Sequence, residues 1–261
     1  MDLHLANKVA VVTGASKGIG LAISQAFAEE GAHVIAGARN NTPELSALEA
    51  AGSATFVAAD LSTPEGPRAL VAAAAERGGV DVLVNNAGAV ATRFDGILSV
   101  TDEEWDAALS LNFLSAVRTT REAIPHMLAR GGGSIVMIGS VNATLPEWNI
   151  VDYSATKAAL ANYAKSLSKE FGPKGIRVNT ISPGPVSTDL WLAEDGVAAK
   201  FASASGACPD EIVATVAAGA PTGRFTTPRE VADLTVFLAS SLSANTTGAD
   251  VRIDGGYVTT L

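Results

Sequence analysis

Tyr153 and Lys157 are the residues whose types and spacing point most directly to chemistry. They stand four positions apart in the segment YSATK, so on a helix their side chains share one face. A free phenol has a pKa of about 10, too high for a base at neutral pH. A nearby ammonium group favours the phenolate and lowers this pKa. Tyr153 could then accept a proton from an alcohol or donate one to a forming alkoxide, a contribution typically worth ~10²–10⁴-fold in rate.

Two more polar residues could act with this pair. Ser140 ends a predicted strand, at the edge of the sheet where ligands bind in open α/β folds. Its hydroxyl could bind a substrate oxygen and hold it near Tyr153. Asn112 lies within a predicted long helix, where asparagine is a mildly poor helix former. Each residue taken alone could equally be structural.

A glycine-rich segment could bind phosphate. Residues 13–20 read TGASKGIG between a predicted strand and a predicted helix. Glycines permit the sharp turn and the close approach of backbone to a phosphate, and the amide groups and dipole of the following helix favour an anion. The G-x-x-x-G-x-G spacing differs from the common dinucleotide fingerprint. A tight turn with only a structural role is the alternative.

The end of the second predicted strand indicates which dinucleotide would bind. NAD sites typically hold a carboxylate there for the ribose 2′-hydroxyl, whereas this chain reads HVIAGARN without an acidic residue. Ala38 leaves room, and Arg39 offers a fork of donors suited to a 2′-phosphate. Lys17 could add a second positive charge. We therefore expect NADP(H) to be preferred over NAD(H), unless Arg39 is only a solvated loop charge.

The elements that must position these residues alternate along the chain. Predicted strands cover residues 9–13, 33–38, 54–58, 80–85, 134–140, 176–182 and 249–253. Predicted helices cover residues 19–30, 43–51, 64–77, 102–129, 152–171 and 228–239. Most of the strands are apolar throughout, which is typical of a parallel sheet covered on both faces.

This alternation predicts an α/β fold, a Rossmann-like doubly wound parallel sheet of about seven strands with helices on both faces. No linker is visible, and we expect residues 1–261 to form one NAD(P)-binding domain. The alternation of strands and helices is interrupted at residues 187–224, after the sixth strand. An insertion there is a candidate substrate lid, the alternative being an exposed loop. Trp148 and Trp191 flank the predicted site in sequence and could form its walls.

Taken together, TGASKGIG, NNAG, YSATK and PGP, in this order on these elements, resemble the motifs of the short-chain dehydrogenase/reductase family. The resemblance spans essentially the whole chain, through DGGY at residues 254–257. It implies a catalytic set of Asn112, Ser140, Tyr153 and Lys157. In this set Asn112 holds a water in a proton relay with Lys157, which also binds the nicotinamide ribose.

The resemblance also implies a cofactor-binding set: Gly14, Ser16, Lys17, Gly18, Ile19, Gly20, Arg39, Asp60, Leu61, Asn86, Ala87, Gly88, Tyr153, Lys157, Pro183, Gly184, Val186 and Thr188. Asp60 would contact the adenine ring, although an aspartate there could equally cap the following turn. Thr188 would contact the nicotinamide carboxamide, or cap the next helix.

Composition excludes several other functions. With 18 basic and 27 acidic residues the formal charge is −9, which disfavours nucleic acid as a partner. A single cysteine, Cys208, rules out an internal disulfide, and three dispersed histidines offer no metal-ligand spacing. No apolar run reaches membrane-spanning length, and no leader-like segment opens the sequence. We therefore expect a soluble cytoplasmic protein without a metal site or a membrane partner.

The expected function is hydride transfer between NADP(H) and a carbonyl or secondary alcohol, in an enzyme of the carbonyl reductase or alcohol dehydrogenase type. The substrate would be a small molecule, and the resemblance implies a homotetramer or homodimer. Two alternatives stay open: an isomerase or dehydratase that retains a nucleotide, and a nucleotide-sensing protein without turnover.

Overall fold

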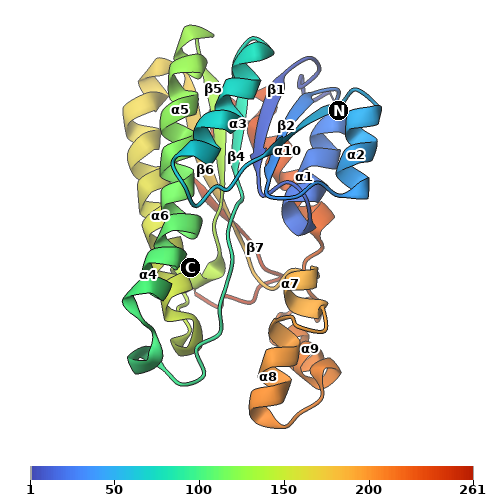
Figure 1. The fold of residues 1–261 in the computed structure, drawn as a ribbon, viewed down its shortest axis with the longest axis vertical. Helices are drawn as coiled ribbons and strands as arrows, with labels where there is room; N and C mark the ends of the chain where they lie inside the picture. The colour runs from blue at the N-terminus through green and yellow to red at the C-terminus, as the bar shows by residue number, and fades with distance from the viewer. Residues whose placement is uncertain (1, 261) are drawn as a thin grey trace.

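Strands and helices alternate along the chain in the computed structural model, which describes residues 2–260 (Figure 1). The strands are β1 (Val9–Thr13), β2 (His33–Ala38), β3 (Ala54–Ala58), β4 (Val82–Asn85), β5 (Gly133–Ile138), β6 (Ile176–Pro183) and β7 (Asp250–Ile253). The helices are α1 (Gly18–Glu29), α2 (Pro43–Ala50), α3 (Glu65–Glu76), α4 (Asp102–Leu109), α5 (Ser115–Ala129), α6 (Val151–Phe171), α7 (Asp189–Leu192), α8 (Val197–Ser205), α9 (Pro209–Ala218) and α10 (Pro228–Ala239).

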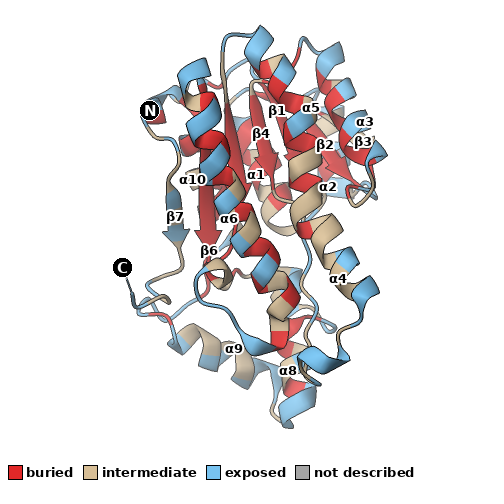
Figure 2. Ribbon diagram, turned by 90° about the vertical axis from the view of Figure 1, so that its left-hand side faces the viewer, coloured by how far each residue is buried: buried red, intermediate tan, exposed pale blue. Residues whose placement is uncertain are grey.

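All seven strands form one parallel sheet in the order β3-β2-β1-β4-β5-β6-β7. Alternate residues of β1 point to opposite faces. Ala10 and Val12 pack in a core with α1 and α10, and Val11 packs in a second core with α3, α5 and α6. Because both faces are covered, the central strands are buried along their length (Figure 2). The predicted doubly wound sheet with helices on both faces is confirmed.

The predicted helix 102–129 is not continuous. It divides into α4, a π-helical turn at Ser110–Leu114 (η2) and α5. A π-turn inserts one extra residue into the helical repeat and often marks a functional site. Asn112 lies in this turn. The predicted strand 134–140 also ends early, at Ile138, so Ser140 lies in the loop beyond it.

Residues 187–224, expected as an interruption or lid, contain the three helices α7, α8 and α9. They lie beyond the carboxyl ends of the strands, at the lower end of Figure 1. The segment leaves and rejoins the sheet at one place, where Val186 and Thr226 form a parallel bridge. Ser187 N–H also donates to Thr226 O at 2.9 Å, and Thr226 N–H to Pro185 O at 3.0 Å. The two ends of the segment are therefore fastened to each other.

The ends of β1 and β4 are joined by a network of hydrogen bonds around Thr13. Its hydroxyl accepts from the amides of Asn86 at 2.8 Å and Ala87 at 3.0 Å and donates to Val84 O at 3.2 Å. The Asn86 amide Nδ2 donates to Thr13 O at 2.9 Å and to Gly14 O at 3.2 Å. The glycine turn is thus held against β4.

Gly20 is required by this close packing. A Cβ at Gly20 would lie 2.1 Å from Gly14 O and 2.5 Å from Asn86 Nδ2, far inside contact distance. Gly14 itself has φ of +67°, a conformation that side chains disfavour. The turn therefore has no room for side chains at these two positions.

We expect Gly20→Ala to destabilise the protein by about 2–3 kcal/mol, because the added methyl displaces backbone rather than a flexible side chain. Urea denaturation would measure the change. Gly172→Ala is the matched control, since Gly172 has φ of −53° and no atom within 4 Å of a built Cβ. Equal stability of the two variants would contradict this account of the turn.

Candidate active site

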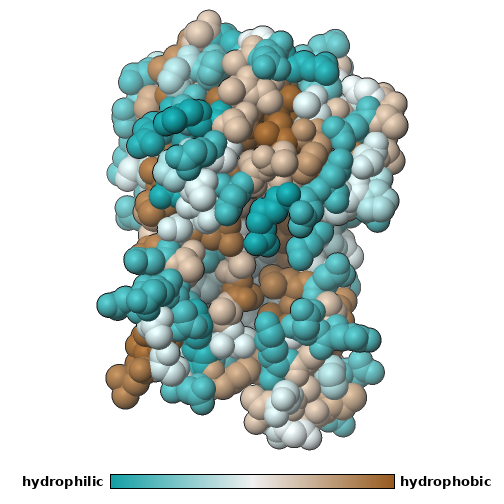
Figure 3. Space-filling model, viewed as in Figure 1, coloured by the Kyte–Doolittle hydropathy of each residue, from teal (hydrophilic) through white to brown (hydrophobic). Residues whose placement is uncertain are grey.

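A cleft of about 1040 Å³ lies at the carboxyl edge of the sheet. Its walls are the glycine turn, the ends of the strands, the start of α6 and the helices α7 and α8. The molecule is hollowed there, between the sheet and α7–α9 (Figure 3). Every residue of the cofactor-binding set predicted from the sequence lines this cleft, as do Ser140, Tyr153 and Lys157 of the catalytic set.

Tyr153 and Lys157 lie on the first turns of α6 and face the same side. The Lys157 ammonium nitrogen is 5.6 Å from the centre of the Tyr153 ring. It donates a hydrogen bond to Ile138 O at 2.8 Å, at the end of β5. Lys157 is only 4% exposed, and this desolvation lowers its pKa to about 8. The lysine thus joins the helix to the edge of the sheet directly beneath the tyrosine.

The pKa of Tyr153 differs from the expectation. Burial in the cleft raises the pKa of its phenol above the ordinary value, and the hydrogen bond with Ser140 offsets only part of this rise. The predicted lowering of the Tyr153 pKa by Lys157 is therefore wrong for these groups. The physical reason is that the loss of hydration disfavours the phenolate, and the group that offsets part of this effect is Ser140 rather than Lys157.

Ser140 is oriented by a neighbour that the sequence left unassigned. Its hydroxyl donates to Asn142 Oδ1 at 3.1 Å and accepts from the Asn142 amide at 3.1 Å. Asn142 is itself held by a bond from its Nδ2 to Leu145 O at 3.0 Å. These bonds fix the position of the Ser140 hydroxyl beyond the end of β5. Only the position of Asn142, two residues after Ser140, could have suggested this role.

Asn112 lies behind the cleft rather than on its wall. Its Oδ1 accepts from the Ala89 amide at 2.8 Å. A Cβ built on Gly88 would lie 2.8 Å from this oxygen and 3.6 Å from the Lys157 nitrogen. Asn112 and Lys157 therefore converge on the backbone of Gly88, and the π-turn directs the asparagine towards this point.

The other end of the cleft carries the positive charges. Lys17 and Arg39 are both exposed there. Asp60 accepts from the Ser62 amide at 2.9 Å and the Ser62 hydroxyl at 2.7 Å, so it caps its own turn, as the sequence allowed. These bonds lower the pKa of Asp60, with a smaller contribution from Arg39.

Thr188 stands between the glycine turn and the lid. Its methyl carbon would be 3.4 Å from a Cβ built on Gly18. It precedes α7 but its side chain makes no capping bond to that helix. The alternative of a helix cap is therefore not found, and a polar contact towards the cleft stays a prediction.

Aromatic rings form the wall remote from the glycine turn. Phe94 packs edge-on against Phe201 of α8, with ring centres 5.1 Å apart, and Trp191 packs in the same way on Phe225 at 5.3 Å. Trp148, 65% exposed, also lines the cleft, as does Trp191. Both tryptophans therefore lie where the sequence suggested, whereas nothing in the sequence singled out Phe94 or Phe201.

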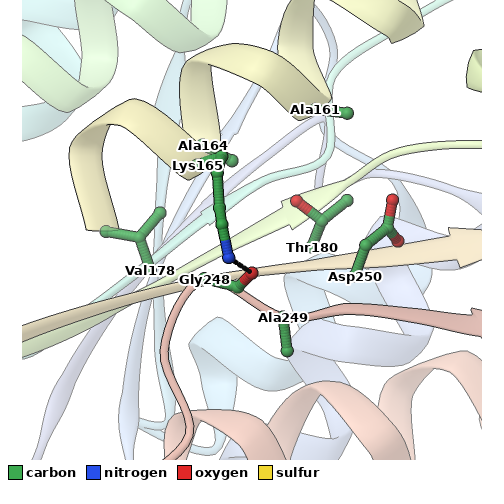
Figure 4. A pocket seen from close by; sticks show the side chains of 8 residues that line it. All are labelled: Ala161, Ala164, Lys165, Val178, Thr180, Gly248, Ala249 and Asp250. Carbon is green, nitrogen blue, oxygen red and sulfur yellow. Dashed lines mark hydrogen bonds between the residues drawn. The ribbon is translucent and has the colours of Figure 1, made fainter. Parts of the chain in front are cut away.

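A second hollow, of about 210 Å³, lies between α6 and β7 (Figure 4). It contains no residue of either predicted set, and its lysine, Lys165, donates to Gly248 O at 2.7 Å. Within residues 2–260 no group of acidic, cysteine and histidine side chains could hold a metal ion. In the same part of the chain, no helix combines the length and apolarity needed to cross a membrane.

Comparison with known proteins shows that this chain is similar to oxidoreductases in sequence and in fold. A family model described as enoyl-(acyl carrier protein) reductase matches residues 14–258. The 3-oxoacyl-[acyl-carrier-protein] reductase FabG of Vibrio cholerae is 34% identical over 97% of this chain and 98% of that protein. D-threitol dehydrogenase of Mycolicibacterium smegmatis is 38% identical over 98% and 95%, respectively. The crystal structure of L-sorbose reductase from Gluconobacter frateurii, complexed with NADPH and L-sorbose, covers 100% of both chains at 39% identity with a TM-score of 0.91.

We expect Lys157→Met to be more stable than the parent at pH 7. The folded protein holds the Lys157 proton less tightly than the unfolded chain, whose lysine pKa is about 10.4. The free energy of unfolding must therefore rise with pH between about 8 and 10.4. Below that range the buried charge of Lys157 lowers it by about 3 kcal/mol. Methionine should recover about 1–3 kcal/mol, after loss of the bond to Ile138 O.

Urea denaturation at pH 7 and at pH 10 would test this expectation. The gain should shrink at the higher pH, where the parent lysine is largely neutral in the folded protein. A variant that is less stable than the parent at pH 7 would show that the hydrogen bond outweighs the desolvation of the ammonium group.

Proposed function

The chain belongs to the short-chain dehydrogenase/reductase family, and on that premise we propose that it transfers a hydride between NADP(H) and the carbon of a small carbonyl or secondary alcohol. Tyr153 is the proton-transfer residue. The observation that carries the proposal is the convergence of Tyr153, Ser140 and Lys157 at one end of a cleft whose other end is the glycine turn.

The chain's own residues suit the phosphates of such a cofactor. The first turn of α1 receives no side-chain cap from Lys17, so its amide groups can bind a pyrophosphate. Arg39 and Lys17 would bind the 2′-phosphate, and Lys157 the nicotinamide ribose. When bound, the nicotinamide supplies or accepts the hydride.

The protein supplies the proton. At neutral pH the raised pKa of Tyr153 keeps the phenol protonated, so it acts as a general acid towards a forming alkoxide. Ser140, oriented by Asn142, helps to hold the substrate oxygen. Alcohol oxidation needs the phenolate, which burial disfavours. These properties favour carbonyl reduction at neutral pH and alcohol oxidation only at alkaline pH.

We also propose that residues 187–224 form the substrate lid, with Trp191 and Phe201 as its contacts in the cleft. The named activities of the relatives support a hydroxyl or ketone substrate, since they include reduction of L-sorbose and oxidation of D-threitol. The intact set of Ser140, Tyr153 and Lys157 argues against a purely nucleotide-sensing protein. Loss of 340 nm absorbance when NADPH is mixed with L-sorbose or acetoacetyl-CoA would separate turnover from sensing.

Tyr153→Phe should lower kcat by at least ~10²-fold, because the acid is removed, while the Kd for NADPH stays within a factor of about two. For the parent, the rate of reduction should fall as the pH rises through the tyrosine pKa, and the rate of oxidation should rise. Tyr163→Phe is the control, since Tyr163 lies on the same helix but packs against Phe113. Near-normal turnover of the Tyr153→Phe variant would show that Tyr153 is not the proton-transfer residue.

Arg39→Asp should shift the preference from NADPH towards NADH. Loss of charge-assisted hydrogen bonds to a phosphate corresponds to a fall of about 10–100-fold in the ratio of kcat/KM for the two cofactors. Arg68→Asp, on the exposed face of α3 and outside the cleft, controls for the change of charge. An unchanged ratio in Arg39→Asp would mean that this guanidinium is only solvated.

A further inference from the structure

Arg93 lies between the beginnings of two helices. It belongs to the loop that joins β4 to α4, and its side chain is 13% exposed. The guanidinium pairs with Asp152 at the start of α6, with Nη2 at 2.7 Å and Nε at 3.3 Å from Oδ2. It also pairs with Glu104 in the first turn of α4, and its amide donates to Asn149 O at 2.7 Å. One residue thus fastens the loop to both helices.

Asp152 connects this ion pair to the catalytic tyrosine. Its side chain is 2% exposed, and its second oxygen, Oδ1, accepts the backbone amide of Tyr153 at 2.9 Å. The carboxylate therefore binds Arg93 on one side and the backbone of Tyr153 on the other. Asp152 thus connects the Arg93 side chain to the backbone of the first turn of α6.

Glu104 holds the other side of the guanidinium. Its Oε2 accepts the Thr101 amide at 3.0 Å and so completes a capping box at the start of α4. Its Oε1 accepts from Arg93. The arginine is therefore held by two carboxylates that are each fixed in a helix terminus, which leaves little freedom to the planar fork.

Phe94 follows Arg93 directly and lines the cleft. Its edge-on contact with Phe201, at 5.1 Å between ring centres, brings α8 of the lid against the loop. Fixing Arg93 therefore also fixes the aromatic wall that the substrate would meet. The Arg93–Asp152 ion pair therefore helps to position both Tyr153 and the Phe94–Phe201 wall.

We propose that Arg93, through its ion pair with Asp152, is a positioning residue that holds Tyr153 and the Phe94–Phe201 wall in one geometry. The proposal rests on the proposed function, since its kinetic readout is turnover. Stability alone does not account for such a pair, because apolar residues of similar size commonly replace buried ion pairs without loss. The fixed direction of the guanidinium is what an apolar replacement lacks.

The test compares Arg93→Met, Asp152→Asn and the double variant, with Arg229→Met as the control. Arg229 also pairs with two carboxylates, Glu29 and Asp233, but is 55% exposed. Arg93→Met should lower the Tm, because it leaves Asp152 buried and unpaired. The double variant removes both charges and should recover most of that loss.

The kinetic defect should survive this recovery. In the double variant we expect kcat for the reduction of L-sorbose, or of whichever ketone the parent turns over, to fall about 10–100-fold. The KM for that ketone should rise, while the Kd for NADPH stays within a factor of about two. A double variant with parental stability and parental kinetics would overturn the proposal.

Hydrogen exchange gives a readout that needs no turnover. Amides of residues 148–157 and 197–205 should exchange faster in the double variant, whereas those of α1 should not change. Unchanged exchange in either of the first two segments would overturn the coupling even if the parent proved inactive. A parent that reduces no ketone, combined with the expected exchange, would reject the proposed function and leave the coupling supported.

Discussion

The hydrogen bonds around Thr13 and Asn86 are the constraint on which the rest of the site depends. They join β1 to β4, the two strands at which the order of the sheet reverses. Open α/β sheets bind ligands at this point, because the connections on its two sides run in opposite directions and leave a crevice. The glycine turn leads from one strand, and the backbone of Gly88 and the loop of Arg93 lead from the other. The hydrogen-bonded junction of β1 and β4 therefore fixes the position of both ends of the cleft.

Desolvation tunes the chemistry at this crevice. The same exclusion of water raises the pKa of the Tyr153 phenol and lowers that of the Lys157 ammonium group, so it shifts the protonation equilibrium of each group towards its uncharged form. A buried amine destabilises the fold at neutral pH, and sites that carry out chemistry often retain such a cost in stability. The geometry of Lys157 is nevertheless tightly specified by its bond to the end of β5.

Much of this architecture could be predicted from the sequence, for physical reasons that differ by element. The bounds of β1 and β2 agree with the prediction because a run of residues buried on both faces has a clear beginning and end. The bounds of β3, a half-buried edge strand, agree as well. The π-turn at Asn112 could not be predicted, since it depends on packing against neighbouring elements. Helices α7, α8 and α9 follow one another within the described residues 189–218 with no strand between them, so the alternation of strand and helix that located most other helices gave no signal for them. The role of Arg93 rests on ion pairs with two helices, one of them 59 residues away in the sequence, and that of Asn142 on bonds within one turn. Neither kind of contact leaves a periodic pattern in the sequence.

The bridge between Val186 and Thr226 has a consequence for how proteins of this build can diversify. The two ends of the intervening segment are already bonded to each other, so changing its length does not alter the pairing of the strands. The loss of conformational entropy on closing such a segment also grows only slowly with its length. Helices α7–α9 can therefore be lengthened, shortened or exchanged as a cassette. New substrates could be acquired by remodelling this cassette alone, with the nucleotide crevice inherited unchanged.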